Sequence, residues 1–170
     1  MLGGSYHGGP LRNLPRLSSS TGVVAVLAIS PYDEDHASLR NIFSHTKWEV
    51  FEARSYQEAL DFLAKNRIGV LLCESDLPDG TWKELQESLS DSLQPPLLIV
   101  TSRHADDGLW AEVLNLGAYD VVSKPFEREE VIRIISLAWL HWKEQMAQKA
   151  GTPASKAMDI SSIQTNSAAV

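Results

Sequence analysis

Cysteine, cationic side chains and long apolar runs are all scarce in this sequence of 170 residues. The single cysteine, Cys73, excludes an intramolecular disulfide, and its apolar neighbours favour a small buried hydrophobe. Lys and Arg number 15 against 22 Asp and Glu, and the formal net charge of −7 argues against a nucleic-acid-binding protein. No stretch approaches the roughly 20 apolar residues of a membrane span, and the N-terminus lacks the apolar core of a signal peptide. We therefore expect a cytoplasmic protein with no membrane contact.

The length and the 44% of hydrophobic residues suit one domain with its own core. Residues 1–21 are rich in Gly, Pro and Ser, and residues 150–170 are small and polar. Segments of this kind bury too little apolar surface to offset their ordering entropy. The sequence thus predicts one domain over residues 22–149, between a disordered N-terminal segment and a disordered C-terminal tail.

Apolar runs of strand length alternate with amphipathic segments along the whole predicted domain. Strands are expected at 22–30, 48–54, 68–74, 97–102 and 118–122, and helices at 33–44, 55–66, 82–89, 106–116 and 126–149. Asp33 is expected to cap the first helix, and Ser55 with Glu58 forms a capping-box pattern at the second. Gly117 suits the left-handed position that ends the fourth helix.

Five rounds of strand and helix predict a parallel sheet with helices on both faces, a doubly wound α/β sandwich. In such sheets the chemistry collects beyond the carboxyl ends of the strands. The residues expected at that edge are Ser30, Pro31, Asp33, Glu74, Asp76, Thr101, Ser102 and Lys124.

Three segments carry a family resemblance: LLCESDLPDG (71–80), IVTS (99–102) and GAYDVVSKPF (117–126). In this order and at this spacing they resemble the CheY-like receiver domains of bacterial response regulators, over residues 23–149. The resemblance implies a three-layer αβα sandwich with a five-stranded parallel sheet of order 2-1-3-4-5, as in flavodoxin-like proteins. It also implies a two-component phosphorelay signalling protein that is not an enzyme.

The resemblance assigns roles to individual residues. The acid four residues before the proline of Leu-Pro-Asp-Gly is the phosphorylated aspartate in receivers, and here it is Glu74. Thr101, followed by Ser102, matches the strand-end threonine that contacts the phosphoryl group, and Lys124 matches the lysine that pairs with it. The bond between Lys124 and Pro125 is expected to be cis.

This sequence departs from the family pattern at two places. The first is Glu74 itself, and the second is the end of the first strand, where Ser30-Pro31 replaces the acidic pair that holds Mg²⁺. Mg²⁺ demands near-octahedral oxygen ligands at short range, so the loss weakens the expected metal site. Asp33, Glu74 and Asp76 remain as candidate ligands, with helix capping as the alternative role of Asp33.

Three interpretations of the site remain open. A permanent pair of Glu74 with Lys124, supported by Thr101, can hold the domain in an active-like state without phosphorylation. The same pair can also be a vestigial structural contact, or phosphorylation can occur at Glu74 or through Asp76. In each case the expected action is docking of a single-domain response regulator on a histidine kinase, a phosphotransfer protein or a separate effector.

Two rival functions remain, a small doubly wound flavin-binding protein and a homodimer built on the face of the fourth helix, fifth strand and fifth helix. The candidate contact residues on that face are Trp110, Val121 and Trp139. Trp142 lies three residues after Trp139, so the two share one side of the last helix, whose end is expected to project past the sheet. The histidines, among them His36, are expected at the surface or rim.

Overall fold

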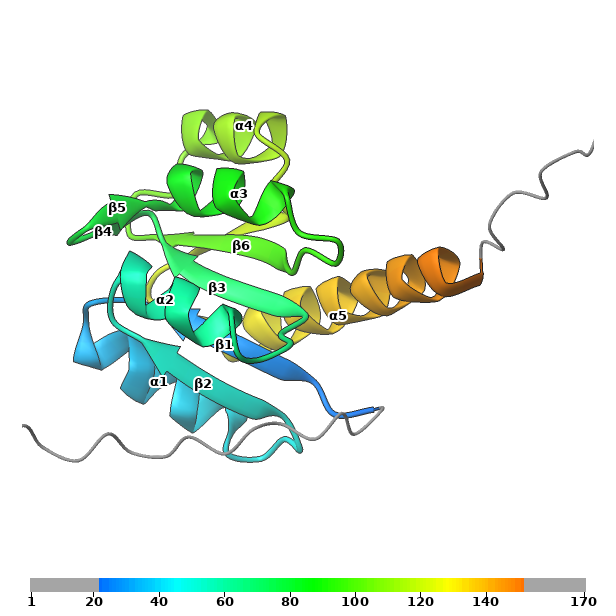
Figure 1. Ribbon diagram of the computed structural model, residues 1–170. Helices are drawn as coiled ribbons and strands as arrows, with labels where there is room; N and C mark the ends of the chain where they lie inside the picture. Colours follow the sequence, from blue (N-terminus) through cyan, green and yellow to red (C-terminus); the bar gives the residue numbers. More distant parts are fainter. Residues whose placement is uncertain (1–21, 152–170) are drawn as a thin grey trace, which may run out of the picture.

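A computed structural model describes residues 22–151, so the predictions for 1–21 and for most of the C-terminal tail lie outside the described residues. Five parallel strands form one sheet of order β2-β1-β3-β6-β7, which confirms the predicted topology (Figure 1). The strands are β1 (Ala25–Ile29), β2 (Glu49–Ala53), β3 (Val70–Glu74), β6 (Leu97–Ser102) and β7 (Asp120–Ser123). Every residue of β1 and β3 is buried, because helices cover both faces of the sheet.

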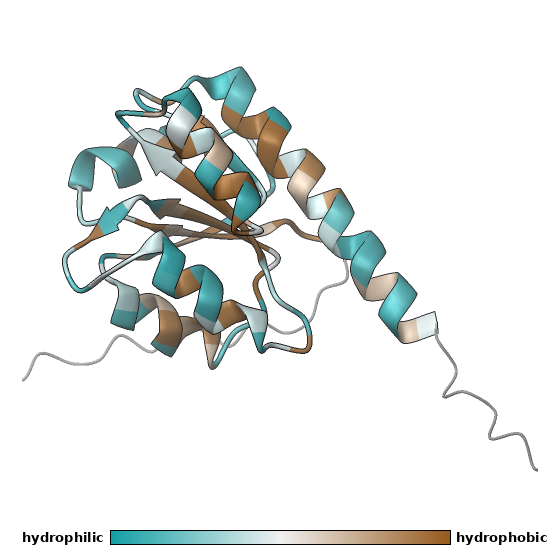
Figure 2. Cartoon of the chain, turned by 90° about the horizontal axis from the view of Figure 1, so that it is seen from above, coloured by the Kyte–Doolittle hydropathy of each residue, from teal (hydrophilic) through white to brown (hydrophobic). Residues whose placement is uncertain are grey.

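The helices divide the core into two layers. They are α1 (Asp33–Phe43), α2 (Tyr56–Leu63), α3 (Trp82–Ser90), α4 (Asp107–Asn115) and α5 (Arg128–Gly151). Phe62, Leu85 and Val113 bring α2, α3 and α4 into the apolar cluster on one face. Leu39 and Ile135 bring α1 and α5 into the cluster on the other face. Figure 2 shows the result as brown strands between helices whose outer surfaces are largely teal.

A two-stranded hairpin, which the sequence interpretation treated as a plain turn, lies between β3 and α3. It pairs β4 (Asp76–Leu77) with β5 (Gly80–Thr81) in antiparallel fashion. The hairpin places Thr81 at the start of α3, where its hydroxyl accepts from the Glu84 backbone N–H and the Glu84 carboxylate accepts in return. This capping box explains why α3 begins where it does.

Helix ends follow the sequence signals in part. The Ser55 hydroxyl accepts from the Glu58 backbone N–H at 3.2 Å, as predicted for α2. The Glu58 carboxylate, however, accepts from the Arg54 N–H at 2.7 Å instead of completing the box at Ser55. Gly117 has a φ of 83°, which confirms the predicted left-handed residue after α4.

Helix α5 is the longest element and runs past the edge of the sheet, as predicted (Figure 1). The Trp139 and Trp142 rings stack with centroids 5.2 Å apart over the start of β3. A Cβ atom on Gly69 would lie 2.7 Å from the Trp139 ring, so only glycine allows this close approach. Within residues 22–151 no helix combines the length and the apolar character that a membrane crossing requires.

Candidate functional site

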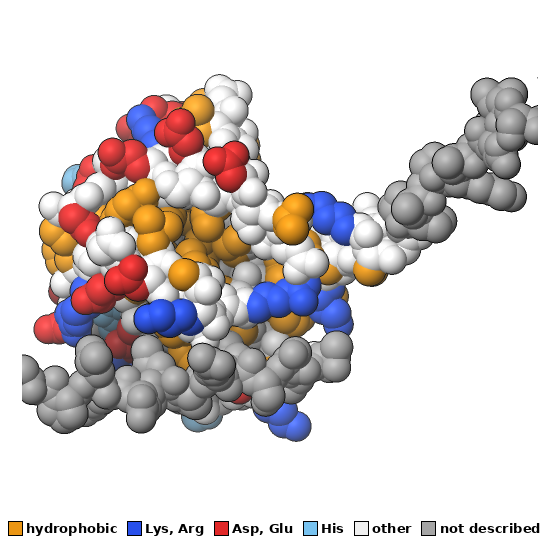
Figure 3. All heavy atoms as spheres, in the orientation of Figure 1, with side chains coloured by type: hydrophobic (Ala, Val, Ile, Leu, Met, Phe, Trp, Pro, Cys, Tyr) orange, Lys and Arg blue, Asp and Glu red, His pale blue; other side chains and the backbone are white. Residues whose placement is uncertain are grey.

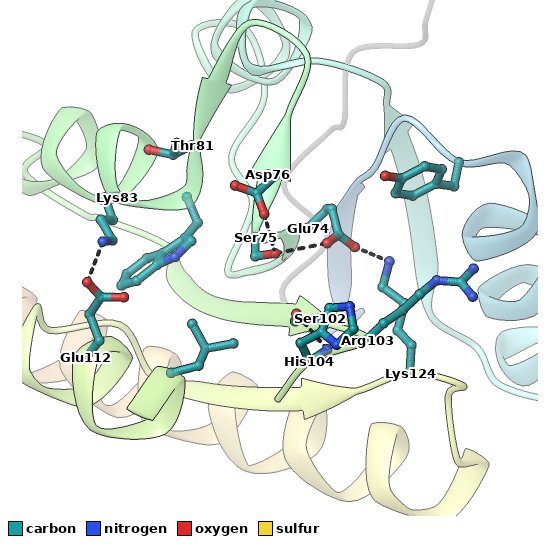
Figure 4. Close-up of a pocket in the computed structure, with 13 residues that line it drawn as sticks. Glu74, Ser75, Asp76, Thr81, Lys83, Ser102, Arg103, His104, Glu112 and Lys124 are labelled. Atoms are coloured by element: carbon teal, nitrogen blue, oxygen red, sulfur yellow. Dashed lines mark hydrogen bonds and ion pairs between the residues drawn. The ribbon is translucent and has the colours of Figure 1, made fainter. Parts of the chain in front are cut away.

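A cavity of about 460 Å³ opens at the carboxyl edge of the sheet, where β3, β6 and β7 end. Its wall includes Tyr32, Glu74, Asp76, Trp82, Ser102 and Lys124. These residues are far apart in the sequence, and parallel pairing of the strands brings them together because all the strands end at one edge. Figure 4 shows Asp76, Ser75, Glu74 and Lys124 of this wall joined in a row by hydrogen bonds and an ion pair.

Glu74 is the last residue of β3 and lies beside Thr101 across the strand ladder. Its side chain is 9% exposed and its Oε2 atom forms an ion pair with Lys124 Nζ. The Oε1 atom accepts from the Ser75 hydroxyl at 3.1 Å, and the same hydroxyl lies 3.1 Å from Asp76 Oδ2 (Figure 4). A hydroxyl has one hydrogen, so it serves only one of these two carboxylates at a time.

Lys124 approaches Glu74 from the loop after β7, and its peptide bond to Pro125 is cis, which confirms the expectation. The lysine side chain is 4% exposed. Its ammonium group contacts two carboxylates, Glu74 and Asp35, the latter at 2.5 Å. The Tyr32 ring lies beside the ammonium, with the centroid 5.1 Å from Nζ.

Asp35 is the site residue that the sequence interpretation missed. Its carboxylate is buried and accepts from the Ser30 hydroxyl at 2.5 Å, beside the contact with Lys124. A signal was available in the sequence: Asp35 stands four residues before Leu39 and seven before Ile42, so it shares the inward stripe of α1. His36 stands three residues before Leu39 and seven before Phe43, so it is buried on the same stripe, whereas a surface position was expected.

The prediction that Asp33 caps α1 is wrong. Tyr32 is the N-cap residue and makes no side-chain cap bond, and Asp33 is the first residue inside the helix. The Asp33 side chain is 84% exposed and accepts from Arg54 Nη2 at 2.5 Å. The hydrogen bond and positive charge of Arg54 hold the pKa of Asp33 below its ordinary value. Arg54, the residue after β2, thus draws this carboxylate away from both the helix end and the cavity.

The acidic residues present do not fit a Mg²⁺ site. Asp33 and Glu34 turn outward to Arg54 and Arg103. Glu74 pairs with the Lys124 ammonium, which also pairs with the buried Asp35. The other carboxylates of the cavity wall are Asp76 and Glu112, and Glu112 pairs with Lys83. Across residues 22–151, no three His, Cys, Asp or Glu side chains are grouped so as to bind a metal ion. The donor set therefore lacks the oxygen ligands that Mg²⁺ requires.

The two other predicted pocket residues, Thr101 and Ser102, both lie near the end of β6, but only Ser102 lines the cavity. Ser102 lines the cavity, where its hydroxyl accepts from the His104 N–H at 3.1 Å, and its carbonyl accepts from the Lys124 N–H at 3.0 Å. Thr101 is buried at the end of β6 and is not part of the cavity wall. The role of each in binding a phosphoryl group stays a prediction.

Of the three residues predicted at the partner face, Trp110 is the most exposed, and its contact with a partner stays a prediction. Trp110 on α4 is 38% exposed and Leu114, one turn later, is also exposed. Val121 is wrong as a contact residue, because β7 lies within the sheet and leaves this side chain 1% exposed. Trp139 is half-buried because its ring packs on Trp142, so it presents little surface to a partner.

Cys73 precedes Glu74 in β3 and is fully buried. Burial, with a smaller contribution from the Glu74 charge, raises the pKa of its thiol far above the ordinary value. The thiol therefore stays protonated, which agrees with the predicted role as a core residue.

Comparisons with known proteins agree with this geometry. The family model described as "Response regulator receiver domain" matches residues 32–136, and the chain belongs to this family. It is a receiver domain of the two-component signalling class, whose members are signalling proteins rather than typical enzymes and interact with kinases and effector proteins.

Two curated relatives and two solved structures illustrate the likeness. FixJ of Rhizobium meliloti is 34% identical over 95 residues, covering 54% of this chain and 46% of FixJ. CrdR of Helicobacter pylori is 28% identical over 96 residues, covering 55% of this chain and 45% of CrdR. The chain thus spans less than half the length of these relatives.

The chemotaxis response regulator CheY4 of Vibrio cholerae has a TM-score of 0.62 at 19% identity, covering 68% of this chain and 98% of that one. The beryllofluoride-activated NtrC4 receiver domain dimer has a TM-score of 0.64 at 20% identity, covering 69% and 98%. At these identities the likeness supports the fold alone.

Proposed function

We propose that this receiver domain signals without phosphorylation and acts by docking on a protein partner. The observation that carries the proposal is the buried contact between Glu74 and Lys124. In a phosphorylation-dependent receiver, charge added at the strand end biases two packings of the domain. Here a carboxylate one methylene longer than aspartate already reaches the lysine, so part of that bias is built into the sequence.

Two features of the site disfavour phosphoryl transfer. Such transfer depends on positioning and on neutralisation of the developing charge by a metal and a cation. The Lys124 ammonium is divided between Glu74 and Asp35, and the acidic residues do not fit Mg²⁺. The longer Glu74 side chain also places its oxygens farther out, in the space that a phosphoryl group needs.

The proposed partners are a histidine kinase, a phosphotransfer protein or an effector carried by another chain. Trp110 and Leu114 on α4 supply an exposed apolar surface of the kind that anchors protein interfaces. A location in the cytoplasm and the lack of enzymatic activity remain predictions that accompany this proposal.

The second candidate function is that of a phosphorylatable receiver using Asp76. Asp76 is exposed, lines the cavity and accepts from the Ser75 hydroxyl, so its carboxylate is within reach of a small phosphodonor. No comparable observation favours the flavin-binding alternative, since the segment after β1 carries Asp33, Glu34 and Asp35, which would repel a flavin phosphate.

Labelling with radioactive acetyl phosphate in the presence of Mg²⁺ tests the proposal. We expect no stable label on the wild-type protein. The variants Asp76→Asn and Glu74→Asp are run beside it, the first to detect use of Asp76 and the second to test whether a shorter acid restores acceptance. Label on the wild type would contradict the proposal, and its loss in Asp76→Asn would establish the second candidate instead.

A further inference from the structure

We infer that Asp35 is a positioning residue that fixes the Lys124 ammonium inside the protein and so keeps it from serving a phosphoryl group. This inference rests on the proposed function and names the residue responsible for it. It concerns a carboxylate in the first turn of α1, outside the strand-end segment Ser30-Pro31 where receivers carry their acidic pair.

The contacts of Asp35 tie together distant parts of the domain. Its Oδ2 atom lies 2.5 Å from Lys124 Nζ, in the loop between β7 and α5. The same oxygen accepts from the hydroxyl of Ser30, just beyond β1, at 2.5 Å. The side chains of Asp35 and Lys124 are 6% and 4% exposed, so water contributes little to the solvation of either charge.

Both carboxylates have Lys124 as their cationic partner, and each also accepts a hydrogen bond from one hydroxyl. Glu74 also receives a hydrogen bond from the Ser75 hydroxyl at the cavity wall. Asp35, among residues 22–151, has Lys124 as its only cationic partner. If the lysine turned toward a phosphoryl group, Asp35 would become an unpaired buried charge, which is strongly unfavourable.

Two aromatic rings also flank the ammonium. The Tyr32 and Phe126 ring centroids lie 5.1 Å and 6.0 Å from Nζ. The lysine is therefore held by two anions and two ring faces, from the start of α1, the end of β3 and its own loop. We expect its amine to be protected from reagents that modify exposed lysines.

Competitive acylation with a limiting dose of an N-hydroxysuccinimide acetate, read by peptide mass spectrometry, measures this protection. Lys83, whose side chain is 47% exposed, is the internal reference within each sample. The test variant is Asp35→Asn, and the matched control is Asp33→Asn, which removes the same charge from the same helical turn but faces Arg54.

In Asp35→Asn we expect acylation of Lys124, relative to Lys83, to rise by at least about tenfold. Removing one partner of a buried ion pair costs more free energy than a tenfold change in an equilibrium constant represents. In Asp33→Asn the ratio stays at the wild-type value. Ser30→Ala keeps every charge and removes only the hydrogen bond to Asp35, so we expect a smaller rise in the acylation of Lys124. This variant tests the inference if Asp35→Asn does not fold.

The inference would be overturned if Lys124 in a folded Asp35→Asn protein were acylated no more than in the wild type. If only Ser30→Ala folds, the same result in that variant would overturn it. That result leaves the proposed function standing, since Glu74 alone would then hold the lysine. Conversely, acetyl phosphate label on the wild type removes the proposed function whatever the acylation ratio, so the two failures are distinguishable.

Discussion

At the residue scale, the site is governed by one ammonium shared between two carboxylates. Lys124 contacts both Glu74 and Asp35 in a space that is closed to water on most sides. Surface pairs such as Lys83 with Glu112 lie in solvent on both sides, and screening makes them weak. Residues with the same charge therefore contribute very differently to stability.

This contrast gives a quantitative prediction. Lys124→Met leaves two buried carboxylates without a cation, and we expect it to lower the free energy of unfolding by about 3–5 kcal/mol. Lys83→Met, which removes an exposed pair, should lower it by about 0–1 kcal/mol. Urea unfolding followed by tryptophan fluorescence measures both, and similar losses in the two variants would contradict a buried role for Lys124.

The sequence predicted the meeting of Glu74 and Lys124, and the structure brings them together. It did not predict Asp35, because three consecutive acids look alike until the phase of the helix is considered. Sequence patterns did not predict the residue roles that depend on the direction in which a side chain points.

At the element scale, the hairpin beside the cavity also caps the start of a neighbouring helix. Asp79, in the turn of the β4–β5 hairpin, accepts from the backbone N–H groups of Tyr56 at 2.7 Å and Gln57 at 3.0 Å. The bond from Gln57, followed by that from Tyr56, lowers the pKa of Asp79 below its ordinary value. The hairpin thereby ties the start of α2 to the cavity wall.

A lowered pKa means that folding favours the ionised carboxylate. The contribution of Asp79 to stability is fully present above the ordinary aspartate pKa of about 3.9 and is lost as the pH falls through the lowered pKa. We expect the stability difference between wild type and Asp79→Asn to be largest near neutral pH and to shrink in acid. Urea unfolding across this pH range tests the expectation.

Thr81→Ala is the uncharged comparison, since it removes the cap of α3 without removing a charge. Its loss, about 0.5–2 kcal/mol, should show no comparable decline in acid. Parallel pH profiles for the two variants would mean that ionisation of Asp79 does not act through the α2 cap.

The elements themselves were largely predictable, because apolar periodicity is a local property of the chain. The β4–β5 hairpin was not, since its strands have two residues each and carry no period. The bond from the Arg54 N–H to the Glu58 carboxylate was also missed, because Arg54 and Ser55 are adjacent and the sequence does not show which of their N–H groups the carboxylate accepts from.

At the scale of the whole molecule, charged and apolar side chains share one face. Figure 3 shows several acidic side chains near the top of the visible face, acidic and cationic side chains together at its left edge, and apolar side chains between them. The exposed apolar side chains of α4, Trp110 and Leu114, lie on one side of that helix, four residues apart. Exposed apolar patches often mark sites of protein interaction, so this strip is the docking surface that our proposal predicts.

We expect this strip to support weak self-association of the domain at high protein concentration. Trp110→Ala should reduce it, while changing the free energy of unfolding by no more than about 0.5 kcal/mol, the usual range for a surface substitution. Sedimentation equilibrium measures the first effect and urea unfolding the second. Leu93→Ala, at a 90% exposed leucine in the loop before β6, is the control that should leave association unchanged. Association that persists in Trp110→Ala would place the contact elsewhere.

The sequence by itself determined the fold class, the order of the strands through the family resemblance, and the meeting of Glu74 with Lys124 at the carboxyl edge. These follow from local periodicity and from motif order, which do not depend on contacts between distant segments. Only the tertiary structure decided the partners of the three acids at the start of α1. Asp33, Glu34 and Asp35 are neighbours in the chain, yet they pair with Arg54, Arg103 and Lys124. The physical reason is that the turn of the helix points each acid in a different direction, and separate segments deliver the cations.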